Sequence, residues 1–270
     1  MASSLALVPN AIVRSRRDLA IASIVTVWVA LALTLDVGVG IWPQRAIGAI
    51  TWVLLATMLR GESPAVRSQI AVCVLFATAI EYTASPLLGF YTYRLANVPA
   101  FVPPGHGLVY FAALALGRSD LFTTHRRLVS RGALVVAGAW ALWGVTIAGR
   151  HDMLGFLAYL LLVRFVLVGQ APSVYAAAFL VTGFLELFGT SVGTWRWSMY
   201  DPTRLVSIGN PPSGISGAYC VIDAVALAGG PLALRLVEWL RTRSWRRPLG
   251  SRLDEAWHPP RAQAVERNAA

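Results

Sequence analysis

Two glutamates, each inside an apolar run and each followed by alternating aromatic residues, are the side chains of this sequence best placed to do chemistry. Glu186 follows Glu81 by 105 residues, and the residues after each acid follow the same order. The first copy is Glu81, Gly89, Tyr91, Tyr93, Pro103, Pro104 and Tyr110; the second is Glu186, Gly193, Trp195, Trp197, Pro211, Pro212 and Tyr219. Because desolvation disfavours a charged carboxylate, two facing acids in apolar surroundings could exchange protons near neutral pH. We therefore expect acid–base chemistry between the two copies.

Asp223 is the third candidate catalytic acid, since it stands in the last apolar run at a depth close to that of the glutamates. We expect it to hydrogen-bond to one glutamate or to position a water molecule. The alternative for Asp223 is a polar contact between helices, and the alternative for Glu81 and Glu186 is a structural hydrogen bond to the neighbouring loop. Arg164, also inside an apolar run, is expected to extend its guanidinium to the membrane surface.

The candidate substrate-binding residues are aromatic and polar groups that follow the two acids. Aromatic residues alternate in each copy, so an extended backbone would turn both rings of a copy to one side, where ring faces can stabilise a cation. An ordinary aromatic belt at the membrane surface would also place aromatic residues here. His106 and Asn210 could donate to a substrate hydroxyl or to water, or cap the following helix. The predicted substrate-binding set is Tyr91, Tyr93, His106, Tyr110, Trp195, Trp197, Asn210 and Tyr219.

The composition predicts a protein that is dissolved in lipid. The chain is 56% hydrophobic and only 13% charged, whereas a soluble domain has about 25% charged residues. The chain contains arginine but no lysine, which excludes lysine Schiff bases and a P-loop lysine. The four histidines lack metal-ligand spacing, and Cys73 and Cys220 stand in apolar runs as small hydrophobic residues. We predict no metal site, no organic cofactor and no nucleic-acid partner.

The apolar runs predict an all-α, polytopic membrane protein with about eight spans, with seven as the competing number. Several runs are shorter than the roughly 20 residues that cross a bilayer. The first run lacks a convincing cleavage site for a signal peptide, so we expect a retained helix. The runs are 19–35, 45–59, 66–85, 105–117, 132–148, 153–168, 173–190 and 214–240.

The arginines set the predicted orientation. With the N-terminus in the cytoplasm, most arginines between runs fall on the inside, as positive-inside anchoring requires. Both termini of a cell-membrane protein would then be cytoplasmic. Four spans separate the two acids, so the copies point the same way, as in a parallel duplicated four-helix unit. The expected divisions are residues 1–128, residues 129–240 and a basic tail, 241–270, that is disordered or bound to the membrane surface.

These two stretches resemble the carotenoid hydratase family, membrane proteins that add water to the terminal double bond of an acyclic carotenoid. The resemblance lies in Glu81, in residues 85–93 and 102–103, and in Glu186, residues 195–197 and residues 209–211. It implies a hydratase of carotenoid biosynthesis in which one glutamate protonates an alkene, aromatic faces stabilise the tertiary cation and the second acid directs water to it. Without water, the same site would isomerise or cyclise a polyene or isoprenoid lipid.

Two other functions fit the same pattern. A proton-coupled transporter or lipid-binding membrane protein could use a parallel repeat to enclose a central site. A partner subunit of an envelope complex could use the basic tail for contact. The sequence leaves the oligomeric state open.

Overall fold

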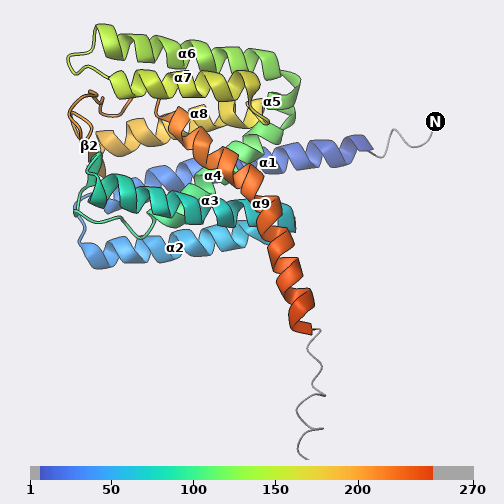
Figure 1. Ribbon diagram of the computed structural model, residues 1–270. Coiled ribbons are helices and arrows are strands. Elements are labelled where there is room, and N and C mark those ends of the chain that lie inside the picture. Colours follow the sequence, from blue (N-terminus) through green and yellow to red (C-terminus); the bar gives the residue numbers. More distant parts are fainter. Residues whose placement is uncertain (1–6, 246–270) are drawn as a thin grey trace, which may run out of the picture.

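The computed structural model describes residues 7–245, and almost all of its regular structure is helical (Figure 1). This confirms the all-α prediction. Within the described residues, eight helices of 16 residues or more coincide with the eight apolar runs. A five-residue helix, α5 (Asp120–Thr124), connects α4 to α6. The eight are α1 (Leu7–Asp36), α2 (Ile41–Leu59), α3 (Pro64–Tyr82), α4 (Val102–Arg118), α6 (Arg126–Thr146), α7 (Met153–Val168), α8 (Pro172–Ser191) and α9 (Ser216–Trp245).

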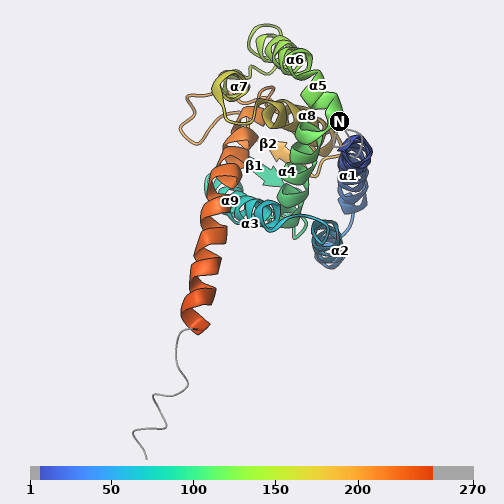
Figure 2. The ribbon, with the colours of Figure 1, turned by 90° about the vertical axis from the view of Figure 1, so that its right-hand side faces the viewer.

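Four helices form the centre of the bundle. α3 packs mainly against α9, and α4 mainly against α8. Figure 2 shows α4 in the interior, with α1 and α2 on one side of the centre and α6 and α7 on the other. Leu108, Phe111 and Ala112 of α4 have no exposed surface. α4 is therefore surrounded by other helices along its length.

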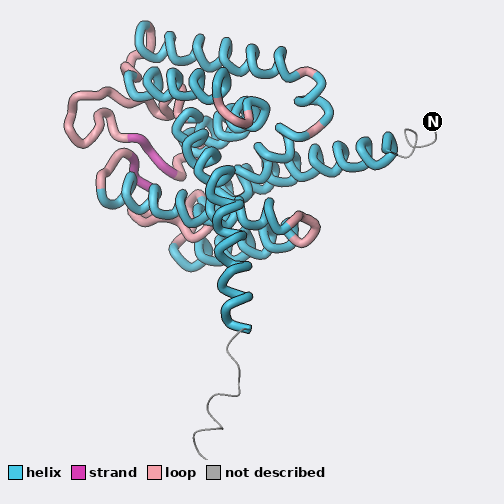
Figure 3. Tube along the Cα trace, turned by 45° about the vertical axis from the view of Figure 1, so that its right-hand side comes forward, coloured by secondary structure: helices cyan, strands magenta, loops and turns pink. Residues whose placement is uncertain are grey.

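The two aromatic motifs meet in a small antiparallel sheet, which defines what we call the β end of the bundle (Figure 3). β1 (Tyr91–Tyr93) and β2 (Trp195–Trp197) pair so that Tyr91 lies opposite Trp197 and Tyr93 lies opposite Trp195. The aromatic side chains are buried, whereas the middle residue of each strand is exposed. The expected extended segments with both rings on one face are thus confirmed.

The first copy contains one more residue than the second between its glutamate and its strand. Ten positions separate Glu81 from Tyr91, and nine separate Glu186 from Trp195. The segment Thr83–Leu87 after α3 is a π-helix with Pro86 inside it, whereas α8 continues as an α-helix to Ser191. A π turn holds one additional residue, and a proline has no amide hydrogen to give to an α-helical bond. The π-helix therefore absorbs the extra residue, so both strands arrive at the same end.

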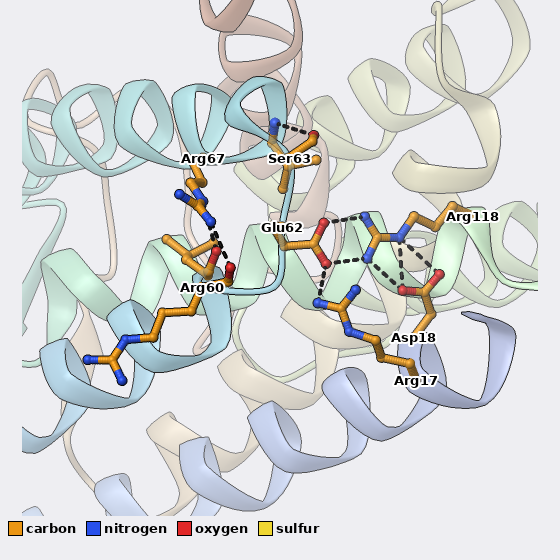
Figure 4. A network of polar contacts seen from close by, with 9 residues as sticks. Arg17, Asp18, Arg60, Glu62, Ser63, Arg67 and Arg118 are labelled. Atoms are coloured by element: carbon orange, nitrogen blue, oxygen red, sulfur yellow. Dashed lines mark hydrogen bonds and ion pairs between the residues drawn. The ribbon is translucent and has the colours of Figure 1, made fainter. Parts of the chain in front are cut away.

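A network of ion pairs joins three helices at the opposite end, which we call the Arg118 end (Figure 4). The Arg118 guanidinium donates to Asp18 at 2.6 Å and to Glu62 at 2.9 Å, and Arg17 contacts Glu62 at 2.9 Å. Asp18 and Glu62 are buried, so removing Arg118 would leave two acids without their main partner. The network ties α1, the turn before α3 and the end of α4 together.

Between residues 7 and 245, five helical segments are long and apolar enough to cross a membrane: Ser15–Asp36, Pro64–Leu87, Arg126–Thr146, Pro172–Ser191 and Ser216–Thr242. α7 is apolar but shorter. Large apolar side chains such as Leu75, Val135 and Leu167 are about two-thirds exposed or more, which is compatible with a lipid environment. The prediction of eight spans stays a prediction.

Several expected boundaries differ from the observed ones. α1 begins at Leu7, well before the first apolar run, and α4 begins at Val102 because Pro103 fits the first helical turn. The division at residues 128 and 129 falls inside α6, and the two predicted halves pack closely together. α9 continues to Trp245, so the first residues of the predicted tail are helical; residues 246–270 lie outside the described part of the chain.

Candidate active site

A cavity of about 290 Å³ at the β end contains both predicted glutamates in its wall. Most of the wall is apolar and comes from seven of the long helices, from both strands and from the turns beside them, as Leu154, Leu185 and Ile222 illustrate. Its volume is close to the lower end of the range for small-molecule pockets, roughly 300–1,000 Å³. The two copies of the motif therefore share one predominantly apolar cavity.

Glu81 lies in the last turn of α3 and accepts three hydrogen bonds. The hydroxyls of Tyr91 and Tyr93 both donate to Oε2 at 2.7 Å. Nε2 of His106, in the second turn of α4, lies 2.8 Å from Oε1. Tyrosine hydroxyls and an imidazole nitrogen can donate or accept a proton. Every partner of Glu81 thus carries a group that can both donate and accept a hydrogen bond.

Glu186 on α8 has a matching arrangement with different chemistry. The indole N–H groups of Trp195 and Trp197 both donate to Oε2 at 3.1 Å. The hydroxyl of Tyr219 on α9 donates to Oε1 at 3.0 Å. Because an indole nitrogen can only donate, Oε2 of Glu186 is held as an acceptor. Among the described residues that donate to Glu186, Tyr219 is the one with a hydroxyl through which a proton could be exchanged.

The two sets of donors contact each other ring to ring. The ring centroids of Tyr91 and Trp197 are 4.6 Å apart, and those of Tyr93 and Trp195 are 6.1 Å apart. His106 and Tyr219 stack at 5.6 Å. Each donor to Glu81 therefore touches a donor to Glu186, which holds the two carboxyl groups across one aromatic cluster.

The strand aromatics are held by glycines at matching positions. Gly89 and Gly193 each stand two residues before a strand with φ of +70° and +80°, a conformation that favours glycine. Gly189 lies directly under the Trp195 ring, where an added Cβ would come within 1.9 Å of a ring carbon. The position three residues after the other glutamate is Ala84. The larger indole ring of Trp195 thus requires glycine at position 189, whereas the matching position beside the smaller tyrosine rings holds alanine.

The two strand tyrosines are permanent hydrogen-bond donors to the Glu81 carboxylate. Burial, followed by the charge of Glu81, raises the pKa of Tyr91 and of Tyr93 well above the usual range. Both phenols therefore keep their protons at any physiological pH and can donate to Glu81.

The structure places three predicted site residues outside this cavity wall. Tyr110 donates to Gln69 at 3.1 Å. Asn210 accepts from the backbone amide of Trp197 at 2.9 Å, which fixes the loop. Asp223 forms no hydrogen bond to either glutamate within the described residues, so the first of its two expected roles is not found. His106 does line the cavity, but it binds Glu81 instead of capping a helix.

Several residues of the cavity wall were not predicted from the sequence. Trp28 of α1 donates its indole N–H to Thr51 of α2 at 3.1 Å, and both residues line the cavity. A lone tryptophan or threonine in an apolar helix carries no recognisable signal, because either is common in membrane helices. The contact between His106 and Glu81 could have been found by treating His106 as the counterpart of Tyr219. Arg164 is exposed on α7, as expected for a side chain that extends to the surface.

The arrangement can move protons inside an apolar space and stabilise positive charge there. Ring faces and two carboxyl groups surround the same volume, so a cation formed in it would meet π-systems and negative charge. In the described part of the chain, no group of three or more His, Cys, Asp or Glu side chains is placed to hold a metal ion. Comparison with protein-family models, with characterised proteins and with solved structures finds no match to this chain.

Proposed function

We propose that this chain is a multi-pass membrane enzyme that protonates a double bond of a carotenoid or another isoprenoid lipid and adds water to the resulting cation. The observation that carries the proposal is the convergence of two hydrogen-bonded carboxyl groups, Glu81 and Glu186, in one apolar cavity with aromatic walls. Such a cavity suits an apolar substrate, and its polar groups suit proton transfer.

The proposed reaction begins with the proton shared by Glu81 and His106. This proton adds to one alkene carbon and leaves a tertiary cation on the other carbon. The faces of Trp195 and Tyr219 and the charge of Glu186 stabilise that cation. A water oxygen then bonds to the cation and releases one proton to Glu186, so the product is an alcohol. If water is kept out, loss of a proton from the cation gives an isomerised or cyclised polyene.

We also propose that all eight long helices cross the cell membrane, with both termini in the cytoplasm and the β end outside. Successive helices run between the β end and the Arg118 end. α4 is too weakly apolar to count as a span by composition, but it is enclosed by other helices. The inner pairs α3 with α9 and α4 with α8 match each other under a parallel duplication of four helices.

A lipid-binding protein or proton-coupled transporter is the second candidate. It is favoured by the complete set of three hydrogen-bond partners on each glutamate, because a fully satisfied polar cluster is also what a static binding site needs. In that case the bound lipid would be recovered chemically unchanged.

Membranes containing the protein, and matched membranes containing the Glu81→Gln/Glu186→Gln double variant, should be incubated with acyclic carotenoids and other polyenes. We expect a product heavier by one water, or an isomer of equal mass, only with the wild type. Mass spectrometry of extracted lipids gives the readout, and immunoblots confirm equal protein amounts. Unchanged polyenes that co-purify with the wild type would support the binding or transport function and overturn the enzyme proposal.

A further inference from the structure

A third buried acid lies just outside the cavity and is not used in the reaction described above. Asp223 follows Tyr219 by four residues on α9, so it occupies the same helix face about 6 Å closer to the Arg118 end. Only 4% of Asp223 is exposed, and its Oδ2 has no hydrogen-bond partner among the described residues. Ionisable groups at such positions in membrane helices are costly and usually functional.

Tyr110 has the same relation to the cavity on the neighbouring helix. It follows His106 by four residues on α4, just as Asp223 follows Tyr219 on α9. His106 and Tyr219 stack, and one turn further along Tyr110 lies close enough to Asp223 for the two to interact electrostatically. The four side chains therefore form two successive layers between α4 and α9.

The surroundings of Tyr110 and Asp223 are built to hold them in place. Gln69 of α3 accepts the Tyr110 hydroxyl proton in a hydrogen bond of 3.1 Å. Gly230 lets α3 approach α9 closely, because an added Cβ would lie 2.9 Å from the Gln69 Cα. With its proton directed to Gln69, the phenol oxygen of Tyr110 keeps lone pairs that can accept a proton from elsewhere.

The ionisable groups around Asp223 are all neutral in their ordinary state. They are Cys73 from α3, Tyr110 from α4, Tyr175 from α8 and Cys220 from α9 itself, and each interacts electrostatically with Asp223. No ion pair within the described residues includes Asp223. Without a paired cation, the Asp223 carboxyl group can release a proton to one neighbour and take one from another.

We propose that Asp223 and Tyr110 form a return route that carries a proton from Glu186 back to the Glu81–His106 pair after each turnover. This inference rests on the proposed function, in which the proton given to the alkene leaves Glu81–His106 and the proton lost by water arrives at Glu186. The route runs from Glu186 through Tyr219, Asp223 and Tyr110 to His106, with water bridging the gaps. One proton leaves and one returns, so the cycle consumes none.

The test separates the first turnover from later ones. Purified protein in lipid vesicles is mixed with excess polyene, and product per chain is followed in time for the wild type, Asp223→Asn and Tyr110→Phe. We expect both variants to form the first product at the wild-type rate and later products about 10-fold more slowly or worse. Cys220→Ser, a change beside Asp223, should leave both phases unchanged. Equal slowing of both phases, or no slowing, would overturn the route.

A second readout needs no substrate and so separates this inference from the proposed function. The infrared carbonyl stretch of a protonated Asp223 should be present in the wild type and missing in Asp223→Asn. On transfer to heavy water its shift should develop more slowly in Tyr110→Phe than in the wild type. A spectrum that Asp223→Asn leaves unchanged, or an exchange rate that Tyr110→Phe leaves unchanged, would refute the route even if the wild type hydrates polyenes.

Discussion

The Glu81 and Glu186 copies of the motif share a geometry but differ in the chemistry of their donors. In each copy two strand side chains donate to Oε2 and one side chain from the following helix contacts Oε1. Around Glu81 all three partners carry groups that can both donate and accept a hydrogen bond, whereas two of the three partners of Glu186 are indoles that can only donate. This difference is the reason why the proposed reaction assigns proton delivery to the Glu81 copy and acceptance of the proton from water to Glu186.

The same two copies diverge more strongly away from the cavity. Twelve residues after His106 stands Arg118, whose ion pairs join α4 to α1 and to the turn before α3. Twelve residues after Tyr219 stands Pro231, and α9 extends past the bundle there (Figure 1). The site is thus the part of the two copies that stays most alike. Selection for a paired site, with freedom elsewhere, would produce this pattern.

The largest expected difference between the copies concerns the acids themselves. Glu81→Gln should lower product formation by about 10³-fold, because general acid catalysis contributes roughly 10²–10⁴-fold. Glu186→Gln should lower it by only about 10-fold, because an amide oxygen still accepts both indole hydrogen bonds and water can take the proton that Glu186 would accept. Product is measured by mass spectrometry of lipids from membranes with equal protein amounts. Equal losses in the two variants would remove the functional distinction between the copies.

Much of this arrangement follows from local sequence patterns. The apolar runs give the eight long helices, and the alternation of Tyr91 with Tyr93, and of Trp195 with Trp197, gives the two strands with their rings on one side. These features depend on neighbours in the chain, so their signal is present in short windows. The predicted parallel repeat would also bring both acids to one cavity, since similar segments with similar orientation reach similar depth.

The partners of the acids could not be derived in the same way. Tyr110 was expected to match Tyr219 because both follow a double proline by six or seven residues. In the first copy Pro103 and Pro104 lie in the first turn of α4, whereas Pro211 and Pro212 precede α9. A count from the prolines therefore arrives at Tyr110, which lies four residues, or one helical turn, beyond His106, the side chain that contacts Glu81. The strand pairing is likewise a long-range contact that packing determines.

The next largest expected effect concerns the side chain that contacts Oε1 of each acid, which is His106 for Glu81 and Tyr219 for Glu186. His106→Gln should slow the first turnover by about 10²-fold, because glutamine cannot pass a proton on. Tyr219→Phe should slow the first turnover by only about 3-fold, because it removes a donor and leaves the ring that faces the cation. Single-turnover kinetics in normal and heavy water provide the measurement. We expect a larger solvent isotope effect in His106→Gln alone; a larger effect in Tyr219→Phe would assign proton delivery to the other copy.

The smallest expected effect tests how the two copies fit different rings against their helices. Gly189→Ala should destabilise the protein by about 1–3 kcal/mol, because the new methyl group collides with the Trp195 ring and a packed core adapts at such a cost. Ala84→Gly, at the matching position beside the smaller tyrosine rings, removes a methyl group from the cavity wall and should cost about 1 kcal/mol, the usual penalty of glycine in a helix. Thermal unfolding in detergent compares the two variants, and Trp195 fluorescence should change only in Gly189→Ala. If Gly189→Ala were the milder change, the close contact between α8 and the indole would not constrain the site, and the two copies would be interchangeable in their packing.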